Sequence, residues 1–421
     1  MFRISLLVLL SLLMFGCYRS TAPSASKPSS PAESPDKPLV ISAAQSPTDG
    51  DCREPELYST ADGRIILNWV EKVGAKRYAL RTALRDTAGW SETQTVAEGE
   101  NWFINWADFP SVIALPDGLL AAHWLVKSGA GTYAYDVNIA LSKDGGKTWD
   151  KPVVPHLDKT HTEHGFVSLI PLTDGRVGAV WLDGRNLKDL NHNDEHSAQT
   201  ESMTLRFAAI DGKGKLSDEF LLDERVCECC QTSAAMTSEG PIVAYRDRSD
   251  TEVRDIFVVR SKNGVWGAPG PVHADNWQIN GCPVNGPSIV ANGSHVAIAW
   301  FTEAGDAPRV KVAFSDDSGA TFARPIEVDD GAAIGRVDAL LLADGSVLVC
   351  WMAGTVESGA IKVRRIQADG TLGQPAEIAK TDISRSSGFP RMARLGNEVY
   401  FAWTEFGKPS RLRLATAEVG L

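Results

Sequence analysis

One phrase recurs along the chain and constrains its fold more than any other feature. In each copy a short apolar strand leads into a turn with Gly, and a second apolar strand then ends in an aromatic residue. The aromatic residues stand 55, 57, 64, 55, 51 and 52 residues apart and are Trp69, Trp124, Trp181, Tyr245, Trp300, Trp351 and Trp403. A nearly fixed period of this length indicates a repeat architecture, in which each unit buries its apolar face against a neighbour.

Each unit continues with a third alternating strand, such as "VNIALS" at 137–142 or "VKVAFS" at 310–315, and usually with a fourth. No convincing amphipathic helical pattern occurs. Four short strands per period predict an all-β fold, a β-propeller of four-stranded antiparallel blades. The seven copies favour seven blades, with six as the alternative. The last unit ends after its third strand, and we expect "PLVISAA" near the start of the chain to supply the missing outer strand.

Two turns after third strands share the pattern Ser-x-Asp-x-Gly-x-Thr-aromatic. They are "SKDGGKTW" at 142–149 and "SDDSGATF" at 315–322. In such an Asp-box the carboxylate accepts N–H groups of its own turn, the Gly takes a positive φ, and the aromatic ring fills the space between strands. The motif is a device of the fold and does not indicate an activity. It assigns structural roles to Ser142, Asp144, Gly146, Trp149, Ser315, Asp317, Gly319 and Phe322.

With these boxes the chain resembles the sialidase-like propellers with BNR or Asp-box repeats, over residues 50–421. The resemblance implies one propeller domain at 38–421 and a glycoside hydrolase that removes terminal sialic acids with three arginines, a Tyr–Glu nucleophile pair and an Asp acid/base. The chain departs from that pattern. "PELYSTADGRIIL" stands where the first blade of a true sialidase has a F/Y-R-I-P motif, no Tyr–Glu pair can be assigned, and true sialidases have six blades. Enzymatic activity therefore stays open.

The first sixteen residues predict an export signal. Arg3 precedes an apolar run that is too short to span a bilayer and that ends at Gly16. The segment "LMFGC" at 13–17 resembles a bacterial lipoprotein cleavage site. It predicts lipidation of Cys17, with an ordinary cleaved signal as the alternative. Residues 17–37 are rich in Ser, Pro and Ala and predict a disordered tether. By resemblance, Tyr18 after the cysteine favours an exported lipoprotein anchored in the outer membrane.

Composition narrows the partners of such a protein. The net charge is −11 and no basic stripe occurs, which argues against nucleic acid. Export places the seven cysteines in an oxidising compartment, where disulfides form readily. We expect a monomer that contacts the membrane through its lipid anchor and binds an anionic carbohydrate or another small ligand.

Three cysteines fall within four residues in "VCECCQT" at 226–232. Counting eleven residues back from the turn Gly reaches the entry of the innermost strand of each unit. In four units this position holds Cys52, His164, Cys229 or Cys282. Entry loops surround the channel mouth of a propeller, where function is usually found. The sequence therefore predicts that these residues rim one face of the molecule.

Three interpretations of these cysteines stay open. Export favours disulfides, which could join Cys229 or Cys230 to Cys282. Clustered thiolates also suit copper or zinc, with a histidine completing the site, and a reactive thiol is the third reading. Cys350 in the strand "VLVCW" is interpreted as core packing. The residues concerned in the disulfide or metal readings are Cys52, Cys227, Cys229, Cys230, Cys282, His161 and His164.

Arginines and carboxylates gather in the loops predicted at the same face. The candidates for catalysis or binding are Glu163, Asp183, Arg185, Arg246, Asp247, Arg248, Arg336, Asp338 and Arg385. Guanidinium groups bind carboxylates bidentately, and a paired carboxyl can protonate a leaving oxygen. The set predicts a cell-envelope propeller that binds an anionic glycan and, in one hypothesis, hydrolyses it. A non-catalytic binding or assembly platform and a periplasmic metal or redox protein are the alternatives.

Overall fold

The computed structural model describes residues 38–187, 202–355 and 358–419. The chain divides into the units Met1–Pro31 and Ala32–Leu421, and every described residue lies in the second. The predicted export signal, Cys17 and the tether at 17–37 lie outside the described residues. Within the described part, no helix has both the length and the apolar character needed to cross a membrane.

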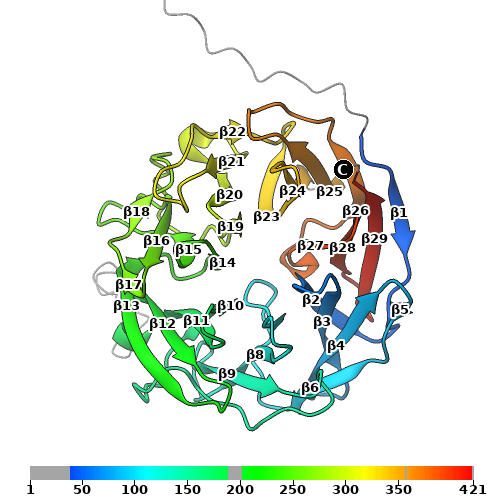
Figure 1. The fold of residues 1–421 in the computed structure, drawn as a ribbon, viewed down its shortest axis with the longest axis vertical. Coiled ribbons are helices and arrows are strands. Elements are labelled where there is room, and N and C mark those ends of the chain that lie inside the picture. The colour runs from blue at the N-terminus through cyan, green and yellow to red at the C-terminus, as the bar shows by residue number, and fades with distance from the viewer. Residues whose placement is uncertain (1–37, 188–201, 356–357, 420–421) are drawn as a thin grey trace, which may run out of the picture. The chain divides into compact units, whose positions relative to one another are not determined.

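Seven antiparallel sheets form the blades of a β-propeller, which confirms the predicted fold class and the count of seven over six. Figure 1 shows the sheets arranged in a ring, with one strand of each facing the centre. These innermost strands are β2 (Cys52–Ser59), β7 (Ser111–Ala114), β10 (His164–Pro171), β14 (Ser233–Met236), β19 (Ser288–Asn292), β23 (Ala333–Leu341) and β27 (Arg391–Leu395).

The second and third strands of each blade carry most of the pairing. The second strands are β3 (Ile65–Lys72), β8 (Leu120–Lys127), β11 (Val177–Asp183), β15 (Pro241–Arg246), β20 (His295–Thr302), β24 (Val347–Thr355) and β28 (Glu398–Glu405). The third strands are β4 (Tyr78–Asp86), β9 (Tyr135–Ser142), β12 (Met203–Ile210), β16 (Ile256–Lys262), β21 (Arg309–Ser315), β25 (Ser358–Ile366) and β29 (Arg411–Glu418).

The outer strands are shorter and less regular. They are β6 (Gln94–Gly99), β13 (Leu216–Val226), β18 (Gly270–Pro271), β22 (Ile326–Glu327), β26 (Ala376–Thr381) and β1 (Ile41–Ala44), and short hairpins add β5 (Gly89–Trp90) and β17 (Val265–Trp266). In the second blade a bridge between Ile139 and Val153 takes the place of a fourth strand. Three single-turn helices complete the described elements: η1 (Arg185–Leu187), η2 (Ala304–Asp306) and η3 (Arg385–Ser387).

The ring closes as the sequence predicted. Strand β1, from "PLVISAA", pairs with β29, so that Ile41 lies opposite Ala417. The seventh blade therefore combines a strand from the beginning of the domain with three from its end. Figure 1 shows β1 beside β29 at the outer side of that blade. This pairing ties the two ends of the ring together by backbone hydrogen bonds.

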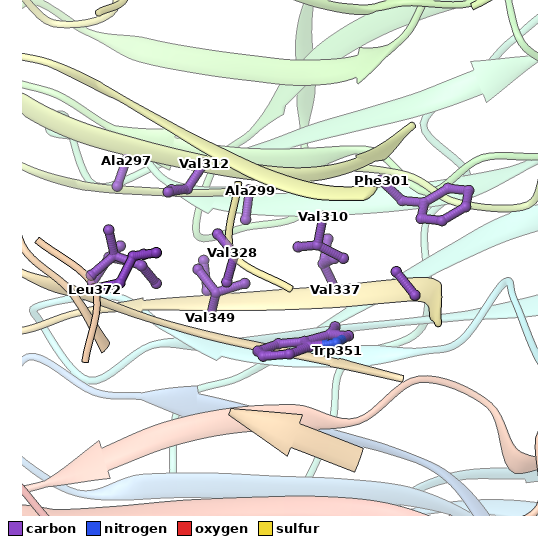
Figure 2. Packing of buried hydrophobic residues seen from close by; sticks show 14 of the residues in the cluster. Ala297, Ala299, Phe301, Val310, Val312, Val328, Val337, Val349, Trp351 and Leu372 are labelled. Atoms are coloured by element: carbon purple, nitrogen blue, oxygen red, sulfur yellow. The ribbon is translucent and has the colours of Figure 1, made fainter. Parts of the chain in front are cut away.

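The core lies between neighbouring blades. Each of the seven repeated aromatic residues stands in the second strand of its blade, and Trp69, Trp181 and Trp351 are fully buried. Figure 2 shows Trp351 of β24 among small and β-branched residues of β20, β21 and β23, including Val310 and Val337. A large buried aromatic in six of the seven blades packs between adjacent sheets. The repeat thus encodes the contact between blades as well as the blades themselves.

Candidate functional site

One edge of every blade carries the candidate residues. Because the strands are antiparallel, the start of an innermost strand and the end of the second strand lie together, as His164 and Asp183 do in register. We call this edge the mouth. The Asp-box turns follow the ends of β9 and β21 and so lie at the opposite edge. A cavity of about 420 Å³ lies among the innermost strands of all seven blades, with Glu56, Asp338 and Arg391 in its wall.

Three cysteines before β14 form a compact group at the mouth. We call Cys227, Cys229 and Cys230 the thiol cluster. The Sγ atom of Cys227 lies 3.8 Å from that of Cys229 and 3.4 Å from that of Cys230, and the three sulfurs lie within 4.8 Å of one another. Cys282, from the loop before β19, lies outside this group but interacts electrostatically with Cys229. The measured distances exceed the roughly 2.05 Å of a disulfide bond, so the sulfurs are in non-covalent contact.

Within the thiol cluster, thiolate is favoured at Cys227, whereas the pKa values of Cys229 and Cys230 are raised. Burial opposes ionisation of Cys227, but hydrogen bonds from Cys229 and Cys230 and the charge of Arg254 hold its pKa well below the usual value. The interaction with Cys229 also lowers the pKa of Cys282, while the pKa of Cys229 is raised because it donates. Arg254 Nη1 lies 3.2 Å from Cys227 Sγ. A low-pKa thiol beside an arginine is nucleophilic and ready to bind metal.

Two arginines and two glutamates surround these thiols. Arg254 bonds Glu228 at 3.1 Å and Glu252 at 2.8 Å. Arg248 bonds Glu252 at 2.6 Å and also contacts Glu228. Both guanidinium groups are nearly buried, so each needs its carboxylate partners to offset the loss of water. Arg248 and Arg254 are thus engaged within the wall of the site.

Two further arginines that the sequence analysis proposed for ligand binding are bonded to the backbone. Arg246 donates to the carbonyl oxygens of Asn285, Arg254 and Phe301 at 2.6–3.0 Å, and its guanidinium carbon lies 4.8 Å from the ring centre of Trp277. Arg336 donates to the carbonyl oxygens of residues 383, 384 and 388 at 2.9–3.2 Å. These arginines join loops of neighbouring blades.

The remaining predicted residues divide among several partners. Arg185 binds Asp183 bidentately, at 2.7 and 2.8 Å. Asp338 accepts hydrogen bonds from Ser288 Oγ at 3.0 Å and the Met392 amide at 2.7 Å. Burial raises the pKa of Asp247 to about 7. Arg385 is exposed on η3, with its guanidinium carbon 5.9 Å from the ring centre of Trp106.

A tyrosine between two acids is the feature that the sequence analysis missed. Tyr135 Oη lies 3.0 Å from Asp108 Oδ2 and 2.8 Å from Glu163 Oε1. A phenol has one hydrogen to donate, so both contacts are hydrogen bonds only when one carboxyl keeps its proton. Burial raises the pKa of Asp108 to about 7 and that of Glu163 to about 8. We call these three residues the acid trio. The one feature of the sequence that could have indicated this site is a tyrosine at the start of a third strand, which lies at the mouth.

The acid trio lies near Cys282 and Glu228, whereas three other predicted residues lie apart. Besides burial, the charges of Cys282 and Glu228 raise the pKa of Glu163. His164, however, stacks on His156 with ring centres 3.7 Å apart and faces carboxylates rather than sulfur. Cys52 lies 3.8 Å from Thr48 Oγ1 in the first blade, and burial raises its pKa to about 12. His161 is exposed in the loop before β10.

Neither a protein-family model nor a curated protein sequence matches this chain. Solved structures show the same fold at low identity. A protein of unknown function from Dyadobacter fermentans has a TM-score of 0.52 and 16% identity, and the match covers 91% of this chain and 99% of that one. At this identity the likeness shows the fold alone.

Two enzymes of stated activity match less closely. The NanB sialidase of Streptococcus pneumoniae has a TM-score of 0.44 and 13% identity over 91% of this chain and 71% of that one. The α-L-arabinofuranosidase Arb93A of Fusarium graminearum has a TM-score of 0.48 and 12% identity, with coverage of 90% and 97%. At such values the likeness concerns the arrangement of strands, and the activities named belong to those proteins.

Proposed function

We propose that this chain is an exported, cell-envelope propeller whose thiol cluster binds a soft metal ion, copper(I) or zinc(II). The observation that carries the proposal is the convergence of three sulfur atoms within 4.8 Å at the mouth. Thiolate is the ligand that both ions prefer, and binding replaces the protons that the thiols would otherwise share. Cys282 interacts with Cys229 but lies outside the group of three sulfurs, so it would have to move to become a fourth ligand.

Local charge supports a thiolate centre in this position. Arg254 offsets part of the negative charge on Cys227, which makes a multi-thiolate site less costly to bury. The wall residues Glu228 and Glu252 in turn hold Arg254 in place. A disulfide within the thiol cluster is the competing chemistry in an oxidising compartment.

Copper(I) titration of the reduced chain against a chromophoric chelator tests this function. The wild type is expected to take up one equivalent tightly, and Cys227→Ser to weaken binding by at least the roughly 100-fold that losing an outer-shell partner can cost. Cys52→Ser is the matched control, because it removes a buried mouth thiol outside the cluster. Unchanged copper(I) affinity in Cys227→Ser would overturn the proposal. So would a thiol count showing that the cysteines of the cluster are all in disulfides in natively purified protein.

The acid trio favours a second function, hydrolysis of an anionic glycan. A carboxyl that keeps its proton at neutral pH can protonate a leaving oxygen, and Glu163 and Asp108 both have raised pKa values. Because Arg246 and Arg336 are bonded to carbonyl oxygens, Arg385 is the exposed arginine among the predicted set that could face such a ligand.

Release of fluorophore from a panel of sialosides and uronides tests the second function. Glu163→Gln is expected to abolish turnover, while Asp247→Asn, which changes another carboxyl of raised pKa outside the trio, keeps it. If the wild type releases fluorophore from no substrate of the panel, the result would instead favour a non-catalytic binding platform.

A further inference from the structure

A second group of donor atoms, which contains no cysteine, lies between the second and third blades. Asp136 belongs to β9, His164 opens β10, and His156 lies in the loop between them. Asp136 Oδ1 stands 3.9 Å from His156 Nε2 and 3.8 Å from His164 Nδ1. The three atoms lie within 4.8 Å of one another, and none of them has a hydrogen-bond partner among the described residues. The two imidazoles are 4% and 0% exposed.

The opposite ring nitrogens determine what these atoms can do. Asp158 faces both rings, with Oδ1 at 3.1 Å from His156 Nδ1 and Oδ2 at 3.3 Å from His164 Nε2. His156 Nδ1 forms a hydrogen bond with Asp158, whereas His164 Nε2 approaches Asp158 without one. With hydrogens on these two nitrogens, the lone pairs of His156 Nε2 and His164 Nδ1 would face the Asp136 carboxylate. Three electron-rich atoms then meet in a buried space, which is unfavourable unless a cation lies between them. A carboxylate behind a histidine is also how metal-binding imidazoles are oriented.

We propose that Asp136, His156 and His164 bind a divalent transition-metal ion, for which Zn²⁺ is the probe. Two imidazole nitrogens and one carboxylate oxygen are a donor set that zinc accepts, and they leave a fourth position open. The exposed His161 follows in the same loop, and its charge acts on Asp136. His161 is therefore a candidate for that fourth position. Asp183 is not a ligand, because Arg185 and Trp181 Nε1 occupy both of its oxygens.

Binding requires a small rearrangement. Tetrahedral zinc with bonds of about 2.1 Å places its ligands about 3.4 Å apart, so both measured separations must shorten by roughly 0.4–0.5 Å. The two rings are parallel within 2°. In-plane lone pairs of parallel rings do not meet at one point, so one imidazole must turn out of the stack. The competing occupant is a proton on His164, whose pKa is raised by Asp158, Asp183 and Asp136 against the effect of burial.

The experiment uses the full chain in a Cys227→Ser background, which removes the soft-metal site of the proposed function. One equivalent of Zn²⁺ is expected to bind and to raise Tm. Co²⁺ is expected to give tetrahedral visible bands without sulfur-to-cobalt charge transfer. His164→Gln is expected to lose this equivalent, and Asp158→Asn to weaken it by about 10- to 100-fold. His295→Gln, which changes a histidine paired with Asp316 in the fifth blade, is the matched control and keeps it.

Two results would overturn the inference. The first is absence of Zn²⁺ binding by the Cys227→Ser chain, which keeps all three proposed ligands. The second is histidine NMR resonances of His156 and His164 that do not respond to Zn²⁺ and report a protonated His164, since a proton then holds the place assigned to the metal. If the Cys227→Ser chain loses copper(I) binding but still binds one equivalent of Zn²⁺, the two sites are distinct.

Discussion

The carboxylates at the two edges of the blades differ although the residue types are the same. In the Asp-boxes, Asp144 and Asp317 accept hydrogen bonds from the N–H and hydroxyl of a Thr four residues later, and these bonds lower both pKa values to about 2. At the mouth, burial raises the pKa of Asp108 to about 7 and of Glu163 to about 8. The comparison shows that an Asp-box turn supplies the hydrogen bonds of its own carboxylate. The carboxyl groups at the mouth are instead hydrogen-bonded by residues of other strands.

The largest effect expected from this difference is on the pH dependence of stability. The pKa of Glu163 rises from 4.5 to about 8 on folding, so its stabilising contribution is complete below pH 4.5 and is lost as the pH rises towards 8. The slope has an upper limit of about 1.4 kcal/mol per pH unit for one proton. Glu163→Gln cannot ionise and is expected to flatten this slope in urea unfolding. An unchanged slope would contradict the assignment of the raised pKa.

A change at Tyr135 tests how the mouth acids are held. Tyr135→Phe leaves Asp108 Oδ2 and Glu163 Oε1 without their shared partner, and we expect a loss of about 1–3 kcal/mol in the free energy of unfolding. Tyr58→Phe is the matched control, since that hydroxyl makes a single bond to the Ala114 carbonyl at 3.2 Å. Equal losses in the two variants would mean that the trio has no special dependence on Tyr135.

The smallest effect is expected at the Asp-box. The pKa of Asp144 is lowered from 3.8 to about 2, so its contribution is present above pH 3.8 and is lost as the pH falls towards 2. Asp144→Asn should lower Tm slightly at neutral pH, and the difference from wild type should shrink in acid. Copper(I) and Zn²⁺ binding should not change. Altered metal binding in Asp144→Asn would contradict the conclusion that the Asp-box edge and the mouth are independent.

The sequence predicted the blades well because their signals are local and repeated. The repeated aromatic of the second strand is buried in six blades and partly exposed, as Trp403, in the seventh. The entry position of the repeat holds Cys229 and Cys282, which interact electrostatically in the structure. It also holds His164, which faces Asp136 and Asp158 instead of the thiols. Equal positions in the repeat therefore did not imply a common site.

The chemistry of the mouth could be foreseen only in part. Arg246 and Arg336 were predicted as ligand-binding residues by their type, but their donors reach carbonyl oxygens of the next blade. Tyr135 and His156 carried no motif, since a tyrosine at a strand end and a histidine in a loop are common. Their partners lie on separate strands and loops, and no spacing rule connects them.

The sequence by itself determined that this chain folds into a seven-bladed ring, because the alternation of apolar residues and the turn residues act within each blade. Only the tertiary structure decided which polar side chains share a site. Loops of different blades meet after the sheets have packed and β1 has joined β29. Burial at those meeting points then raises the pKa values of Asp108 and Glu163, and hydrogen bonds and Arg254 lower that of Cys227, which no local pattern encodes.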